Sequence, residues 1–241
     1  MVNYIWMNPE GRGGGIHAFS ASNPSNTAIV KNNHMQNCGW GLLLGGMDSS
    51  IFDSNIIENV MPTTGGMVSP ITFYGFNNSA TYQNTNNIIS NNIITGTNQY
   101  GIGGGAAAQT PPTLNNVFVG NDFTGFTATT AQVYLNSTAS GNYFGADKKN
   151  GIPTNIFGSL GPDGIAGIID SGNDNSFEKN DFTMSGILGK KYGDQVCVLL
   201  SDTSRDDFIF ESGMFPPGTG GAIFQVIDLG TNNRVVGHPN K

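Results

Sequence analysis

The chain has 241 residues, a formal net charge of −7 and only 11% charged residues. Nucleic acids and anionic membrane surfaces are recognised by basic patches, so an acidic chain of this kind is expected to bind neither. The same charge disfavours a strongly acidic polysaccharide unless a cation bridges the two. No apolar run reaches the length of a membrane-spanning helix. The 35 glycines and abundant asparagines indicate many turns between short strands.

The first 25 residues differ in pattern from the rest of the chain. They contain a short apolar stretch, Tyr4 to Met7, and a glycine-rich stretch, Gly11 to Phe19. We interpret residues 1–25 as an irregular first coil or as an N-terminal lid, because the open end of a repeat array needs a cap. The start lacks the basic residues and long apolar core of a signal peptide. This fits either a cytoplasmic protein or a chain from which a signal has been removed.

A short repeat follows, with the pattern polar, any, apolar, any, any, Asn, any, apolar. Its clearest copy is Asn87 to Ile94, and the copies begin at residues 28, 50, 87, 116, 142, 175 and 208. Each copy is followed by a second apolar stretch, such as Gly41 to Leu44 or Val196 to Leu200. A unit of two strands cannot bury its own inner face, so successive units must stack on one another.

Stacking predicts rows of equivalent side chains along the axis of the array. The first inward row is Val30, Phe52, Ile89, Phe118, Phe144, Phe177 and Phe210. The second is Met35, Ile57, Ile94, Phe123, Phe182 and Phe215. A row of amides is Asn33, Asn55, Asn92, Asn121, Asp147 and Asn180. Asn tolerates the left-handed backbone of a sharp corner, and its amide can bond the amides above and below it.

The Asn-x-Ile-x-x-Asn-x-Ile copies, and the segment Gly141 to Asp147, give residues 26–232 a resemblance to the pectate-lyase-like superfamily. The resemblance implies an all-β fold, a single-stranded right-handed parallel β-helix (β-solenoid) of about seven to eight coils over residues 26–241. It does not imply one activity, because this scaffold carries lyases, hydrolases, epimerases, phage tailspikes and adhesins.

Long loops over a rigid coil often carry function. We expect such loops at residues 58–70, 148–163 and 183–194, walling a lateral groove over the third and fourth repeats. Its floor would include the substrate-binding candidates Tyr100, Phe126 and Tyr134. Between Thr81 and Phe144 the only charged residue is Asp122, so this floor suits an uncharged sugar. An ordinary solvated sheet is the alternative.

An acidic corner is the sharpest chemical feature. Three aspartates, Asp170, Asp202 and Asp228, follow the second strand of successive repeats. Three more, Asp174, Asp206 and Asp207, precede the next first strand. Carboxylates brought this close repel one another unless a cation or a shared proton intervenes, and oxygen-rich clusters suit Ca²⁺. The predicted metal ligands are Asp170, Asp202, Asp206 and Asp228. The alternative is that these are turn residues pointing into water.

Glu178 and Glu211 occupy the same template position in adjacent coils. Their carboxylates could approach the separation of about 5–5.5 Å that retaining glycosidases use. Arg205 is the basic candidate beside the acidic corner, as a lyase acting on uronates would need. The alternative is two exposed glutamates pointing apart.

Cys38 and Cys197 lie five coils apart, which is roughly 24 Å at the spacing of stacked strands. A disulfide needs Cα atoms within about 7 Å, so we predict two free thiols.

Two functional hypotheses follow. The first is an extracellular or surface β-helix that binds or processes a polysaccharide, as a lyase or hydrolase if it is an enzyme. The second is a non-enzymatic shaft of a surface protein or phage tail fibre, which assembles through its ends as a homo-oligomer.

Overall fold

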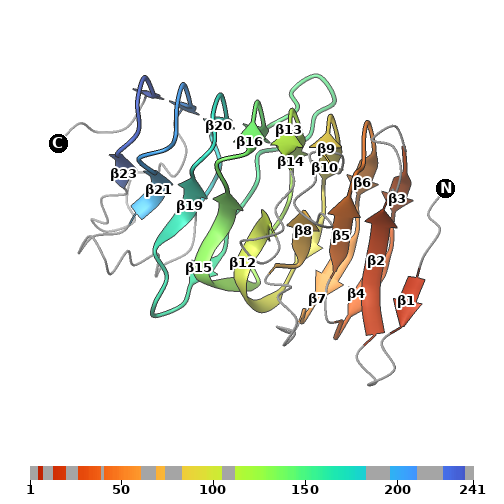
Figure 1. Cartoon of the computed structure of the whole chain (residues 1–241). Helices are drawn as coiled ribbons and strands as arrows, with labels where there is room; N and C mark the ends of the chain where they lie inside the picture. The colour runs from red at the N-terminus through yellow and green to blue at the C-terminus, as the bar shows by residue number, and fades with distance from the viewer. Residues whose placement is uncertain are drawn as a thin grey trace.

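The computed structural model describes residues 5–7, 13–19, 27–38, 41–60, 69–73, 83–104, 112–182, 196–210 and 225–236. Within these ranges the regular elements are strands stacked along one axis (Figure 1). No helix among the described residues is long and apolar enough to cross a membrane.

Two long sheets run the length of the stack. Sheet 1 contains β1 (Ile5–Met7), β2 (Gly13–Phe19), β5 (Leu42–Gly45), β8 (Ile71–Phe73), β12 (Gly96–Gly104), β15 (Phe126–Leu135), β19 (Ala166–Asp170), β21 (Val196–Leu200) and β23 (Gln225–Asp228), with β18 (Ser159–Leu160) beside β15. Sheet 2 contains β3 (Ile29–Lys31), β6 (Ile51–Asp53), β10 (Ile88–Ser90), β14 (Val117–Val119), β17 (Tyr143–Gly145), β20 (Ser176–Glu178), β22 (Phe208–Phe210) and β24 (Arg234–Val236).

Two short sheets flank sheet 2. Sheet 3 contains β4 (His34–Gln36), β7 (Ile56–Glu58) and β11 (Ile93–Ile94). Sheet 4 contains β9 (Asn84–Thr85), β13 (Thr113–Leu114) and β16 (Ala139–Ser140). Neighbouring strands are parallel throughout, except that β1 pairs antiparallel with β2. The predicted fold class, an all-β parallel β-helix, is confirmed.

The interior column of side chains is continuous, as predicted. Val30, Phe52, Ile89, Phe118, Phe144 and Phe177 face one another in register on successive strands of sheet 2. The Phe118 and Phe144 ring centroids lie 4.2 Å apart, and those of Phe144 and Phe177 lie 5.0 Å apart. All three rings are fully buried. The β-helix core is therefore an aromatic stack, which supplies large buried area and favourable ring contacts. Cys38 and Cys197 are buried and are not joined in a disulfide, as predicted.

The last member of the predicted column is wrong by one residue. Phe177 pairs with Ile209 and not with Phe210. The repeat therefore begins at Asp207, and Phe208 and Phe210 lie on the outer face of sheet 2. Their rings contact cations, with the Arg234 guanidinium 5.5 Å from the Phe208 centroid and the Lys179 ammonium 5.2 Å from that of Phe210. Phe215, the last member of the second predicted row, lies outside the described residues.

The fifth repeat also needs a correction, because residues 147–154 form an insertion. Asp147 pairs antiparallel with Ile152 and accepts a hydrogen bond from Asn150, so it is not part of the amide row. Asn155 takes that place. Phe157 likewise completes the second inward row, 5.6 Å from Phe123 and 5.0 Å from Phe182. Within the predicted loop 148–163, the insertion covers residues up to 154, and the regular winding resumes at Asn155. Most of the other two predicted loops lies outside the described residues.

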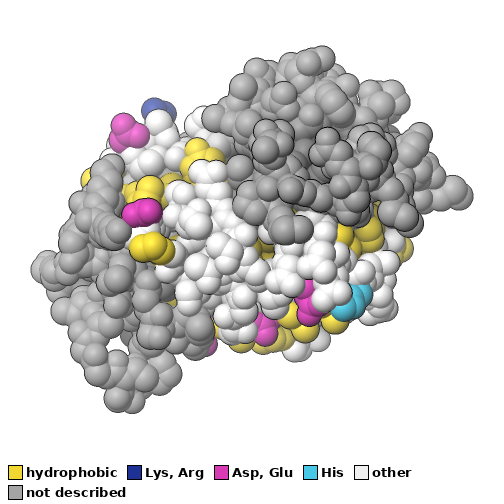
Figure 2. Space-filling view, turned by 90° about the horizontal axis from the view of Figure 1, so that it is seen from below, with side chains coloured by type: hydrophobic (Ala, Val, Ile, Leu, Met, Phe, Trp, Pro, Cys, Tyr) yellow, Lys and Arg dark blue, Asp and Glu magenta, His cyan; other side chains and the backbone are white. Residues whose placement is uncertain are grey.

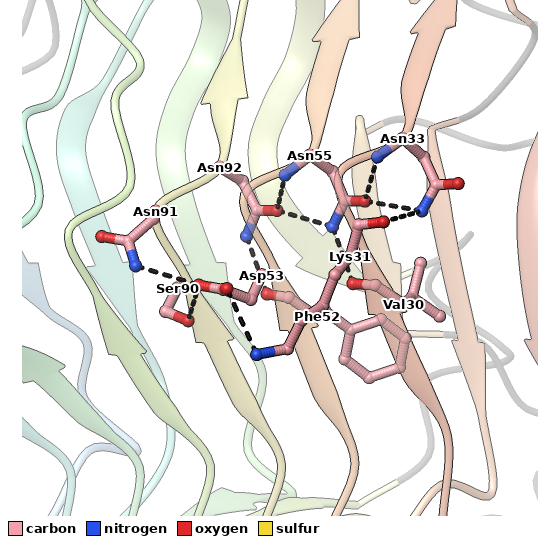
Figure 3. Close-up of polar contacts among 9 residues, drawn as sticks. All are labelled: Val30, Lys31, Asn33, Phe52, Asp53, Asn55, Ser90, Asn91 and Asn92. Atoms are coloured by element: carbon pink, nitrogen blue, oxygen red, sulfur yellow. Dashed lines mark hydrogen bonds and ion pairs between the residues drawn. The ribbon is translucent and has the colours of Figure 1, made fainter.

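The amide row forms a buried ladder at the corner between sheets 2 and 3 (Figure 3). The Asn92 side-chain oxygen accepts bonds from the backbone N and the Nδ2 of Asn55, at 3.0 and 2.9 Å. Asn92 Nδ2 in turn donates to Phe52 O and Asn121 Oδ1. Each amide thus satisfies backbone groups of a neighbouring winding. A second ladder at the other end of the sheet 2 strands contains Ser50, Asn87, Asn116, Asn142, Asn175, Asp207 and Asn233.

At most corners the left-handed residue is the one before the ladder amide, and not the amide itself. Asn32, Ser54 and Asn91 have φ values between 52° and 58°, and each precedes an inward-facing Asn. The two roles that the sequence pattern assigned to one Asn are therefore divided between two consecutive residues.

Gly141 occupies such a left-handed position, with φ of +67°. We expect Gly141→Ala to lower the free energy of unfolding by about 2–4 kcal/mol, because a non-glycine residue costs about 1–2 kcal/mol there and a Cβ would collide with Asn115 Oδ1. Gly151 is the matched control, since it has φ of +68° but nothing within 4 Å of its Cβ position. Urea unfolding followed by circular dichroism should show a clearly smaller loss for Gly151→Ala. Equal losses would contradict the steric argument.

Candidate functional site: the outer face of sheet 1

Two tyrosine rings stack on the outer face of sheet 1. Tyr134 lies between Val133 and Leu135, which are both buried in the main core, so its side chain points outward. Tyr100 belongs to the adjacent strand β12, and its ring centroid lies 4.9 Å from that of Tyr134, with an angle of 18° between the planes. A Cβ on Gly103 would lie 3.3 Å from the Cβ of Tyr100. The bare glycine therefore leaves room for this ring.

The tyrosine pair lies in a separate apolar cluster outside the main core. Its buried members are Ala131, Ala166, Ile169 and Leu199, and Tyr100, Tyr134, Ile165 and Ile227 are partly buried against them. The row through Tyr134 runs in register along sheet 1, through Ile169, Leu199 and Ile227. The rings thus lie at one end of an aliphatic row parallel to the axis of the β-helix.

This face carries little charge. The strands β12 and β15 contain no charged residue, and the one charged residue of β19, Asp170, is fully buried. Seen from below, much of the described surface consists of uncharged polar side chains and backbone, with acidic side chains occurring singly (Figure 2). On the described strands β12, β15 and β19, a ligand would meet aromatic, aliphatic and neutral polar side chains.

The Tyr100 hydroxyl is held by its neighbour in sequence. Gln99 Nε2 donates a hydrogen bond to this hydroxyl oxygen at 3.1 Å. Burial raises the pKa of Tyr100 above its ordinary value, and the adjacent Tyr134 adds to the shift. The hydroxyl therefore stays protonated at neutral pH and can donate to a ligand oxygen.

The third predicted floor residue, Phe126, does not belong to this face. It is 1% exposed and packs edge-on against Phe123 inside the core, with ring centroids 6.2 Å apart. Its assignment to substrate binding is wrong, because the pattern of β15 shifts between Phe126 and Tyr134 and places the two rings on opposite faces.

The predicted catalytic residues can be placed only in part. Glu178 pairs with Phe210 on the next strand of sheet 2. Glu211 lies outside the described residues. The Glu178 carboxylate accepts a hydrogen bond from the Tyr143 hydroxyl at 3.4 Å. Arg205 is exposed at the corner that precedes β22, whereas Glu178 ends β20. The pairing of Glu178 with Glu211 therefore stays a prediction.

The predicted calcium ligands are also separated. Asp170 is buried and in register with Leu200, which separates it from Asp228 on β23. Asp202 and Asp206 are exposed. Among the described residues no three acidic, histidine or cysteine side chains gather in a group that could hold a metal. Asp228 Oδ1 accepts bonds from Gly230 N and Asn233 Nδ2, which is the behaviour of a turn residue.

The two carboxylates that do interact are Asp170 and Asp207, and both are buried. Sequence reasoning grouped Asp207 with the exposed turn aspartates. The signal that could have identified it is its position in the second ladder, where the other windings from 87 to 175 carry Asn.

No protein-family model and no curated protein matches the chain. Among solved structures it is similar to the crystal structure of an alginate lyase from Paenibacillus sp. str. FPU-7. The two chains are 14% identical, with 97% of this chain and 85% of that chain covered and a TM-score of 0.44. A likeness this distant carries no functional argument.

Proposed function

We propose that this protein binds a neutral polysaccharide along the outer face of sheet 1, with Tyr100 and Tyr134 as the main contact. The observation that carries the proposal is the stacked, partly exposed tyrosine pair on the strands β12 and β15, which contain no charged residue. Sugar rings combine apolar C–H faces with hydroxyl groups. Tyrosine matches both, because its ring offers apolar area and its hydroxyl a hydrogen-bonding group.

The arrangement of the rings also indicates how a bound polysaccharide would be oriented. Each tyrosine ring stacks one of its faces on the other ring. The remaining ring surface and the hydroxyl groups of the pair are therefore offered to a ligand. The aliphatic row through Ile169 and Leu199 extends the contact along the axis of the β-helix. A polysaccharide laid parallel to this axis would bury apolar area continuously, whereas a chain laid across the strands would contact only one or two windings.

A binding role is favoured over hydrolysis. A retaining glycosidase needs two carboxyl groups about 5–5.5 Å apart that both reach the scissile bond. The acid pair formed by Asp170 and Asp207 is buried inside the β-helix, where a polysaccharide cannot enter. We place the protein outside the cell or on a cell or virion surface, where polysaccharides of this kind occur.

The test compares variants on two faces of the molecule. Tyr100→Ala and Tyr134→Ala should each weaken binding to the preferred neutral polysaccharide about tenfold or more, because buried aromatic contacts commonly contribute at least about 2 kcal/mol. Tyr143→Ala is the matched control, since Tyr143 is a partly exposed tyrosine on sheet 2. Affinity electrophoresis in gels containing neutral or uronic-acid polysaccharides measures all four proteins.

Loss of binding in both sheet 1 variants, with Tyr143→Ala unchanged, supports the proposal. Equal weakening by all three substitutions would overturn the assignment to sheet 1. A wild-type protein that binds no polysaccharide but forms trimers or filaments as its concentration rises would favour the structural shaft instead.

A further inference from the structure

The second asparagine ladder requires a hydrogen-bond donor and an acceptor from each of its asparagines. Asn142 shows both uses. Its Oδ1 accepts from the backbone N and Nδ2 of Asn116, at 3.0 and 3.1 Å. Its Nδ2 donates to Asn175 Oδ1 at 3.0 Å and to Thr113 O at 2.8 Å. A side chain at such a position is buried, so a missing donor or acceptor cannot be replaced by water.

Asp207 fills a position of this ladder without an amide nitrogen. Its Oδ1 accepts a bond from the backbone N of Asn175 at 2.8 Å, and its own backbone N donates to Asn233 Oδ1 at 2.9 Å. Its Oδ2 is buried and has no hydrogen-bond donor beside it. The carboxyl group thus supplies the acceptor of the ladder, while the donor is missing if the group is ionised.

Asp170 lies against the same position from sheet 1. Its Oδ1 accepts bonds from Gly172 N at 2.8 Å and from Asn175 Nδ2 at 3.2 Å. Its Oδ2 is also buried and has no donor beside it. Asn175 therefore bonds to both carboxyl groups, and each group has one oxygen in need of a proton donor. One proton shared between the two groups satisfies both oxygens.

We propose that Asp170 and Asp207 hold one proton between them, that this proton replaces the missing amide donor of the ladder, and that its loss on raising the pH loosens the C-terminal windings. The proton resides on Asp207. The bonds from Gly172 N and Asn175 Nδ2 stabilise Asp170 as the carboxylate, whereas Asp207 accepts a single bond, from the backbone N of Asn175.

The surrounding charges agree with this assignment. Burial raises the pKa of Asp207 to about 8, and repulsion from Asp170, Asp174 and Asp206 adds to the shift. Burial also raises the pKa of Asp170, to about 6, against the bonds from Gly172 and Asn175. Arg205 is the described cation of this corner, and its exposed guanidinium is not among the groups that shift either carboxyl. The two groups titrate as one coupled pair.

The raised pKa values of Asp170 and Asp207 determine how the folding stability changes with pH. An unfolded Asp has a pKa of about 3.9, so folding takes up protons above about pH 4. The folded pair then holds a single proton between about pH 6 and about pH 8. The stabilisation is complete below the unfolded pKa and is lost as the pH rises through the folded values. The protein should therefore melt at a lower temperature at pH 8.5 than at pH 5.5.

The test is the melting temperature of wild type and Asp207→Asn between pH 5 and 9. The amide supplies the donor permanently, so the variant should match wild type at pH 5.5 and melt about 5 °C or more higher at pH 8.5. Asp202→Asn is the matched control, because it removes one negative charge from an exposed position of the same corner. It should keep the wild-type pH dependence. Parallel curves for wild type and Asp207→Asn would overturn the proposal.

A second measurement does not depend on the variant folding well. Infrared spectra of the wild-type protein at pH 7 should contain the carbonyl stretch of a protonated carboxylic acid, and this band should disappear by pH 9. Exposed aspartates and glutamates are ionised at pH 7 and give no such band. Its absence at pH 7 would show that both groups are ionised and would overturn the proposal.

Discussion

Phe144→Ala is expected to lower the free energy of unfolding by about 3–5 kcal/mol, which is a large part of the stability of a domain. Phe144 is fully buried and lies between Phe118 and Phe177, at 4.2 and 5.0 Å between ring centroids. Alanine would leave a cavity in the middle of the aromatic column and remove both ring contacts. Because each winding contacts only its neighbours, the windings on either side would also become less strongly coupled.

Urea unfolding followed by circular dichroism measures this loss, and Phe208→Ala is the matched control. Phe208 lies on the outer face of sheet 2, partly buried beneath Arg234. Removing that ring leaves no internal cavity, so the expected loss is only about 1 kcal/mol. A broadened or two-step transition for Phe144→Ala alone would indicate that the two halves of the stack unfold separately. A loss no greater than that of Phe208→Ala would contradict the continuous column.

The repeat pattern predicted the stacked architecture because the fold is one local rule applied many times. An inward apolar residue, a corner and an inward amide recur in each winding, so Phe118, Phe144 and Phe177 could be placed side by side from the sequence alone. The rule failed where its local signal was ambiguous. Phe208, Ile209 and Phe210 fit the inward position in either register, and an insertion after Asp147 moved the amide to Asn155.

The candidate site was predicted less well, for a physical reason. Tyr100 and Tyr134, predicted to bind substrate, lie stacked on the outer face of sheet 1, and their role in binding stays a prediction. Phe126 was not separated from them. The alternation of faces along β15 is interrupted at Ala131, Gln132 and Val133, which are all buried in succession. The prediction of an acidic corner was incomplete for a similar reason. Sequence position showed that Asp170 and Asp207 are near in space, but it could not show that they face inward while Asp202 faces water.

Asn92→Asp is expected to destabilise the protein by about 3–5 kcal/mol at pH 7, and by less at pH 4. Asn92 Nδ2 donates to Phe52 O and Asn121 Oδ1, at 3.0 and 2.9 Å. A carboxylate oxygen in its place would face two acceptors inside the β-helix, with no cation to offset the charge. Protonation at low pH would restore one donor. The side chain is fully buried, so water cannot supply the second.

The contrast with Asp207 makes this substitution informative. Asp207 is a natural carboxyl group in the other ladder, where Asp170 provides a second acceptor oxygen for its proton and Asn175 bonds to both groups. Asn92→Asp has no such arrangement, so its cost should greatly exceed that of Asn37→Asp. Asn37 is exposed in a left-handed corner, and its replacement makes the same change in charge. Urea midpoints of the two variants at pH 4 and pH 7 give the comparison. If Asn92→Asp were tolerated as well as Asn37→Asp at both pH values, the ladder amides would be interchangeable with carboxylates, and the shared proton would have no structural role to fill.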